Sequence, residues 1–159
     1  DYKKSGFDRG HLAPAKTMSF SEETMRESFL MSNMSPQKPG FNRGIWKRLE
    51  ERVRSWIPLS DSLYIVTGPV LRGTLGVIGK NEVTVPDAYY KTILRFKNGN
   101  LFGIGFLLKN EKSSKSLASY AVSIDRIEKL TGLNFYQNLR ASIQDKIEAN
   151  SNLSIFLNE

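Results

Sequence analysis

Three short polar segments near the start of the sequence contain the side chains best suited to chemistry. The first is Asp8-Arg9-Gly10-His11, which includes the only histidine of the chain. Histidine is the side chain whose unperturbed pKa lets it act as a base near neutral pH. A lone histidine is often structural, but the adjoining Arg9 and Gly10 predict an exposed backbone with positive potential. Asp8 is expected to fix this loop or to pair with Arg9.

The second and third segments follow closely, and they are Ser32-Asn33-Met34-Ser35-Pro36-Gln37 and Asn42-Arg43-Gly44-Ile45-Trp46-Lys47-Arg48-Leu49-Glu50. In a helix Asn42 and Glu50 would be separated by roughly 12 Å of rise and about 80° of rotation, so they can line one broad face. Arg54 lies one turn beyond Glu50. An ordinary interpretation stays open at this point, with Asn42 as a helix cap and Glu50–Arg54 as an exposed ion pair.

Composition limits the chemistry further. The chain has 159 residues, of which 40% are hydrophobic and 25% charged, as in a single globular domain with a core. Its 23 Lys and Arg against 16 Asp and Glu give a net charge of +7, which favours polyanionic partners such as nucleic acid. The absence of cysteine excludes disulfides, thiol nucleophiles and cysteine zinc sites, and the single histidine excludes multi-histidine zinc sites. No apolar run approaches the roughly 20 residues of a membrane helix.

In the first half of the chain, a short strand is predicted near His11. Ser21 is expected to cap a helix over residues 22–27, and the apolar residues from Phe29 are expected to form a strand ending at Asn33. Apolar residues at spacings of three and four then predict a helix from Asn42 to Trp56, stopped by Pro58.

The second half begins β-rich. Residues 63–66, 77–78 and 83–85 are predicted strands, and 92–96 and 101–108 are expected to pair across a tight Asn98-Gly99 turn. Ser123 is expected to cap a helix that ends at Gly132, and a last helix is predicted over 137–149. Gly103-x-Gly105 lacks the third glycine of a nucleotide-binding loop. Because helices and strands do not alternate regularly, we predict an α+β fold rather than a doubly wound parallel sheet.

Together, the three segments resemble the DNA/RNA non-specific endonuclease family, which includes secreted bacterial nucleases and mitochondrial endonuclease G. The resemblance continues in Val66-Thr67-Gly68-Pro69, in Val85-Pro86-Asp87-Ala88-Tyr89-Tyr90-Lys91 and in Ile127-Glu128-x-x-Thr131-Gly132-Leu133-x-Phe135, so it covers nearly the whole chain. It implies a ββα-metal fold, with a central, mostly antiparallel sheet flanked by helices, in a single nuclease domain over residues 1–159.

The resemblance also implies roles for individual residues. His11 matches the general base that activates the attacking water, and Asn42 matches the sole direct protein ligand of a Mg²⁺ ion, for which Mn²⁺ could substitute. The expected reaction is hydrolysis of DNA and RNA phosphodiesters to 5′-phosphate products.

Four further residues match supporting positions of the family. Glu50 and Asn33 match residues that hold or position water around the ion. Arg9 and Arg54 match arginines near the scissile phosphate. Lys91 recurs in the family, but we assign it no role from the sequence.

Several expectations concern partners and setting. Contacts to phosphate carry no sequence information, so DNA and RNA are both expected substrates, with no membrane partner. The resemblance is compatible with a homodimer and with a protein inhibitor, and it favours a secreted or periplasmic location. Family members usually have β-structure before the Asp-Arg-Gly-His motif, so we expect those N-terminal strands to be missing before Asp1. Two alternatives stay open: a catalytically silent nucleic-acid-binding module on the same fold, and a phosphodiesterase acting on another ester.

Overall fold

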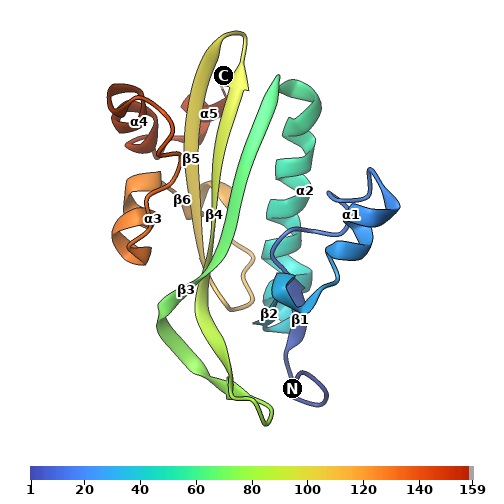
Figure 1. Ribbon diagram of the computed structural model, residues 1–159. Helices are drawn as coiled ribbons and strands as arrows, with labels where there is room; N and C mark the ends of the chain where they lie inside the picture. Colours follow the sequence, from blue (N-terminus) through green and yellow to red (C-terminus); the bar gives the residue numbers. More distant parts are fainter. Residues whose placement is uncertain (158–159) are drawn as a thin grey trace.

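A four-stranded antiparallel sheet in the order β3-β4-β5-β6 forms the centre of the computed structural model, which describes residues 1–157 (Figure 1). Its strands are β3 (Ser62–Ile78), β4 (Val83–Lys97), β5 (Asn100–Lys109) and β6 (Ala121–Val122). A separate antiparallel pair consists of β1 (Asp8–His11) and β2 (Met34–Gln37). The predicted α+β fold with an antiparallel sheet is confirmed.

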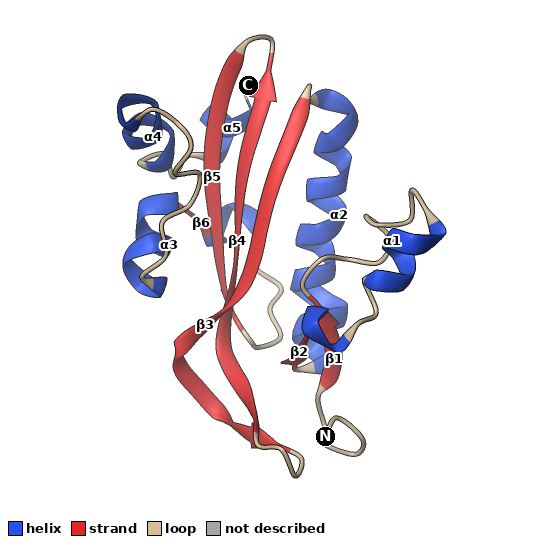
Figure 2. Ribbon diagram, in the orientation of Figure 1, coloured by secondary structure: helices blue, strands red, loops and turns tan. Residues whose placement is uncertain are grey.

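Helices cover both faces of this sheet (Figure 2). On one face lies α2 (Lys47–Trp56), and on the other lie α3 (Ile124–Thr131) and α4 (Ala141–Glu148). The remaining helices are α1 (Glu22–Glu27) and α5 (Leu153–Leu157). Among the described residues, no helix combines the length and the apolar character needed to cross a bilayer.

Strand β4 contributes to two separate hydrophobic cores because its side chains alternate in direction. Tyr89 and Ile93 pack in the core that contains the buried side chains of α2, including Trp56. Tyr90 packs instead against Ile127 of α3 and its neighbours. The helix that contains Glu50 and helix α3 are therefore positioned by opposite faces of one strand.

Local sequence signals located several elements correctly. Asn98 and Gly99 both have positive φ, 50° and 76°, as the predicted two-residue turn between β4 and β5 requires. The Ser21 hydroxyl accepts a hydrogen bond from the Thr24 amide at 3.2 Å and caps α1. Ser123 caps α3, which ends at Gly132 with φ 77°. The final predicted helix, 137–149, contains the shorter α4.

The predicted strand from Phe29 to Asn33 is wrong. Met31–Asn33 form a single 3₁₀ turn, and Phe29, Leu30 and Met31 remain more than half exposed. Strand pairing begins only at Met34, opposite His11. Residues 29–33 therefore pair with no strand, since β2, the partner of β1, starts only at Met34.

The predicted helix from Asn42 to Trp56 is not continuous. A π-helical turn over Phe41–Trp46 precedes α2, with a kink at Gly44, whose φ is −107° and ψ is −110°. This turn places Phe41, Ile45 and Trp46 together in the core, which a regular helix would not do as well. Trp46 and Trp56 are buried, as predicted. The kink changes the direction of Asn42 relative to Glu50.

Gly103 permits α4 to approach the sheet closely. A Cβ atom at this position would lie 2.6 Å from the Ile147 carbonyl oxygen, a backbone atom that cannot rotate away. The side chain of Asn150 also donates a hydrogen bond to the Gly103 carbonyl at 2.9 Å. Gly103 is therefore required for the packing of α4 on the sheet and is not part of a nucleotide-binding loop.

We expect Gly103→Ala to destabilise the protein by about 1–3 kcal/mol, as overpacking of a well-filled site does. The added methyl group must push α4 away from β5. Chemical denaturation followed by tryptophan fluorescence measures the effect. An unchanged midpoint would contradict the close packing of α4 on Gly103.

Candidate active site

The hairpin β1–β2 presents His11 beside the beginning of α2. Asp8 pairs with Gln37 and His11 with Met34 across the two strands. Gly10 lies against the buried Gln37 side chain, where an added Cβ would come within 2.1 Å of its Cδ atom. The glycine beside His11 is therefore needed for the strand to reach this position.

Asp8 joins the hairpin to the π-helical turn. Its Oδ2 accepts hydrogen bonds from the Asn42 amide nitrogen at 2.9 Å and from Arg43 Nε at 2.8 Å, and its Oδ1 accepts one from Arg43 Nη2 at 2.6 Å. The Arg43 hydrogen bonds are the main reason that the pKa of Asp8 is lowered. The expected pairing of Asp8 with Arg9 is replaced by this bidentate pair with Arg43. Because Asp8 holds the Asn42 nitrogen, the Asn42 oxygen is left for another partner.

His11 is partly buried, and its Nε2 atom is buried without a hydrogen-bond partner. The imidazole packs edge-on against the Phe29 ring, with centroids 4.9 Å apart. Burial lowers the pKa of His11 from its ordinary value. The ring is therefore neutral near pH 7 and has an unshared electron pair, as a general base requires.

An open groove of about 610 Å³ brings four of the six predicted site residues together. These four are His11, Asn42, Glu50 and Arg54. The groove is also lined by cationic side chains that the sequence analysis did not single out, namely Lys16, Arg43 and Lys47. Arg43 and Lys47 lie within the third motif segment, and Lys16 follows the first segment closely, so their positions in the sequence were the available indication.

Asn42 is not a helix cap, and Glu50 and Arg54 do not form a close ion pair. Asn42 lies inside the π-helical turn, whose cap position is Gly40, so it is not a helix cap. Within the described residues the ion pairs closer than 4.0 Å are Asp8–Arg43 and Lys47–Glu51, and Glu50 with Arg54 is not among them.

Arg9 and Asn33 do not line the groove. The exposed Arg9 guanidinium lies over the Tyr2 ring, 5.9 Å from its centroid. The Asn33 amide nitrogen donates to the carbonyls of Ala13 and Ser28 at 2.9 and 2.8 Å, and its oxygen accepts from the Ala13 amide at 2.9 Å. Asn33 thus fastens the backbone that follows His11, which is a positioning contact.

A second cavity of about 430 Å³ adjoins the groove at Glu50 and is also lined by Asn33, Thr67 and Lys91. Lys91 on β4 is 2% exposed, donates a hydrogen bond to Thr67 Oγ1 at 2.5 Å and lies 5.1 Å from the Trp46 ring centroid. Burial raises the pKa of Glu50, and the charges of Lys91 and then Arg54 oppose that rise. Lys91, to which the sequence analysis gave no role, is therefore an internal counter-charge for Glu50.

Comparison with known proteins identifies the family to which the chain is related. The family model for DNA/RNA non-specific endonucleases matches residues 1–142. A nuclease of Nostoc sp. is 35% identical, covering 93% of this chain and 57% of the relative. Nuclease C1 of Cunninghamella echinulata var. echinulata is 38% identical, covering 89% and 62%. Human mitochondrial endonuclease G is 34% identical, covering 89% and 52%.

A solved structure has the same fold. A chain in the crystal structure of the EndoG/EndoGI complex superposes with a TM-score of 0.82 at 32% identity, covering 88% of this chain and 63% of that chain. The chain spans about half to three-fifths of the length of these curated relatives. With a family model that matches most of its length and relatives above 30% identity, the chain belongs to the DNA/RNA non-specific endonuclease family.

Proposed function

We propose that this chain is a Mg²⁺-dependent endonuclease that hydrolyses phosphodiester bonds of DNA and RNA and leaves 5′-phosphate ends. The observation that supports this most directly is the groove that gathers His11, Asn42, Glu50 and Arg54. Its side chains supply a base, a neutral oxygen ligand, a carboxylate and a cation, which is the set that phosphodiester hydrolysis requires. Family membership supports the same reaction.

His11 is the proposed general base. Its Nδ1, the ring nitrogen that is not buried, can accept the proton of a water molecule placed between the imidazole and a phosphate in the groove. Because burial holds the pKa of His11 low, the neutral form predominates at physiological pH. The Phe29 ring packs edge-on against the imidazole on another side.

Asn42 is the proposed direct ligand of the metal ion, and the residues present fit a single hard cation. Asp8 binds the Asn42 amide nitrogen, so the amide oxygen is the free end of the side chain. An uncharged oxygen ligand suits Mg²⁺, which keeps most of its hydration shell, and Mn²⁺ is an acceptable substitute. When bound, the ion would stabilise the negative charge that develops on the phosphate. Glu50, on the helix that follows this turn, lines the same groove and would orient water there.

The cationic side chains account for the proposed breadth of substrate. Arg54, Arg43, Lys16 and Lys47 line the groove, and each can contact phosphate, which is common to DNA and RNA. Arg9 would approach the substrate by leaving the Tyr2 ring. Binding through phosphates makes affinity fall steeply as salt is added.

Assembly and location are further proposals. We propose a single nuclease domain over residues 1–159 that acts without a membrane partner. A homodimer and a protein inhibitor are compatible with the fold, and the EndoG/EndoGI complex is an inhibited relative of similar structure. A secreted or periplasmic location stays a prediction, since the relatives include mitochondrial endonuclease G as well as a bacterial nuclease.

His11→Ala should reduce cleavage by about 10²–10⁴-fold, because it removes the base. The test is digestion of plasmid DNA and total RNA at low salt, with Mg²⁺ or EDTA. We expect Mg²⁺-dependent loss of both substrates, abolished in the variant, with an unchanged circular dichroism spectrum. Near wild-type cleavage by the variant would refute the assignment of His11. Binding without cleavage by the wild type would favour a silent binding module, and cleavage of small phosphodiesters alone would favour another ester as substrate.

Asp8→Ala should raise the Mg²⁺ concentration needed for half-maximal activity by about 10–100-fold, because the Asn42 amide is no longer held. Arg43→Ala is the matched control, since it removes the ion pair but leaves Asp8 bound to Asn42. We expect a smaller change in the Mg²⁺ requirement for that variant. Equal requirements in both variants would mean that Asp8 acts only through its ion pair.

Lys91→Met should move the acidic limb of the pH–activity profile to higher pH. The positive charge of Lys91 lowers the pKa of Glu50, so its removal lets burial raise that pKa further, and the ionised form is then lost at a higher pH. Profiles of kcat at fixed Mg²⁺ measure the shift. The exposed Lys129→Met is the control, and coincident profiles for all three proteins would contradict the role of Lys91.

A further inference from the structure

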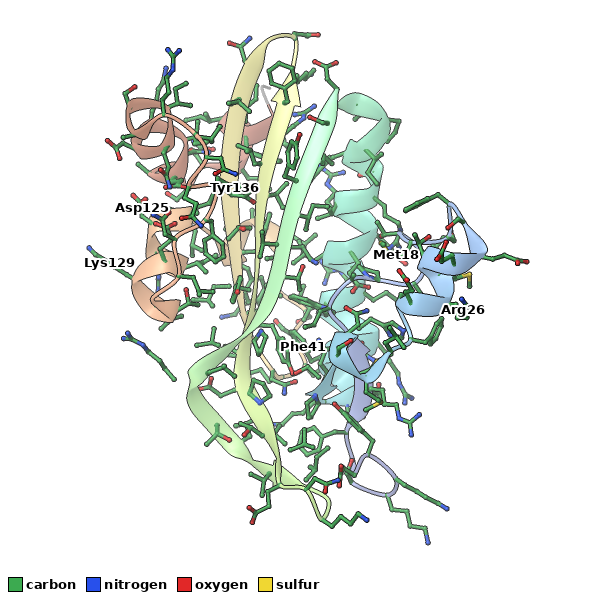
Figure 3. The ribbon with its side chains drawn as sticks, viewed as in Figure 1. Met18, Arg26, Phe41, Asp125, Lys129 and Tyr136 are labelled. Carbon is green, nitrogen blue, oxygen red and sulfur yellow. The ribbon has the colours of Figure 1, made fainter. Side chains whose placement is uncertain are left out.

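A second group of acidic side chains lies on the face of the sheet opposite the groove. Asp125 and Glu128 belong to α3 and Glu148 to α4, and one carboxylate oxygen from each lies within 4.8 Å of the other two. In Figure 3, Asp125 lies at the end of α3 that faces α4, away from Phe41 and Met18. The group is thus separate from the proposed catalytic residues.

Glu148 is the unusual member of this group. Its residue is 3% exposed, and its Oε1 atom is buried without a hydrogen-bond partner. It lies in the last turn of α4, where the helix dipole disfavours negative charge. A buried, unpaired carboxylate at such a position is strongly unfavourable unless something neutralises it.

The protein supplies no cation of its own to this group. Within residues 1–157, no lysine or arginine lies within 4.0 Å of the three carboxylates. The groups that face Glu148 are the acids Glu128, Asp125 and Asp145, and with burial as the larger cause they raise its pKa to about 7. The Phe135 amide donates to Glu128 Oε1 at 2.6 Å, which fixes that carboxylate and leaves its second oxygen available.

We propose that Asp125, Glu128 and Glu148 form a second cation site, which binds Ca²⁺ and links α3 to α4. Three oxygens within 4.8 Å of one another all lie within about 2.8 Å of a common centre, close to the roughly 2.3–2.6 Å of calcium–oxygen bonds, so a small movement of the side chains brings them into contact with one ion. Ca²⁺ accepts irregular sets of carboxylates, whereas Mg²⁺ requires near-octahedral geometry. Asp125 is exposed, so water can complete the coordination shell and the ion can enter from that side. The site does not depend on the proposed nuclease reaction.

Binding should be of the moderate strength found in partly exposed sites, with a Kd of roughly 10⁻⁵–10⁻³ M. Bound Ca²⁺ would remove the repulsion among the three carboxylates and hold the two helices together. At a Ca²⁺ concentration ten times the Kd, the Tm should rise by roughly 3–6 °C for a chain of this size.

The experiment uses Asn42→Ala as a common background, so that cation binding in the groove does not contribute. Ca²⁺ is titrated at pH 8 by calorimetry and by thermal unfolding, into this background and into the same background with Glu148→Gln or Asp145→Asn. We expect one Ca²⁺ site in the background and with Asp145→Asn, which removes an exposed acid of the same helix. With Glu148→Gln the heat and the Tm shift should be lost.

Glu128→Gln is the second test variant, because its amide oxygen can still accept the Phe135 hydrogen bond while the negative charge is gone. We expect it to weaken Ca²⁺ binding at least tenfold. Absence of a Ca²⁺-dependent Tm shift in the background, or an equal shift with Glu148→Gln, would overturn the proposal. A Tm that rises as the pH falls from 8 to 6, with Ca²⁺ having no effect, would show that a proton neutralises Glu148 instead.

Discussion

The carboxylate of Asp8 fixes the relative position of the two elements that form the groove. It belongs to the hairpin strand that ends at His11, and it binds both Asn42 and Arg43 on the π-helical turn. Charge-assisted hydrogen bonds of this kind are short and directional. The proposed base and the proposed metal ligand are therefore held by one contact, and the orientation of the Asn42 amide follows from it. Behind the contact, Phe41 stacks on Tyr89 with ring centroids 5.5 Å apart and supports the turn from the core.

A second constraint is the electrostatic cost of burying the charges of Lys91 and Glu50 next to the groove. The packing of α2 on β4 buries Lys91 and partly buries Glu50, and each charge makes the other less costly. The Thr67 hydroxyl and the Trp46 ring provide further favourable contacts for the ammonium group. Lys91 on β4 and Glu50 on α2 are therefore coupled where the helix packs on the sheet.

Signals that depend on neighbouring residues could be predicted from the sequence. The caps at Ser21 and Ser123 and the Asn98-Gly99 turn depend on local hydrogen bonds and backbone angles, and the structure has all of them. The gathering of His11, Asn42, Glu50 and Arg54 followed from family motifs. The partner of Asp8 lies 35 residues away along the chain, and neither side chain alone identifies the other. The kink at Gly44 was missed because the helical spacing of apolar residues continues past it, and that spacing does not encode backbone angles.

The alternation of side chains along β4 limits which changes of length the fold tolerates. Lys91 faces Trp46, while the next residue, Thr92, contacts the Tyr136 hydroxyl among the elements of the opposite face. Inserting or deleting one residue upstream in this strand would exchange the two directions and send a lysine into the wrong core. Replacing a single residue keeps this alternation, whereas a change of length within β4 would disturb both cores at once.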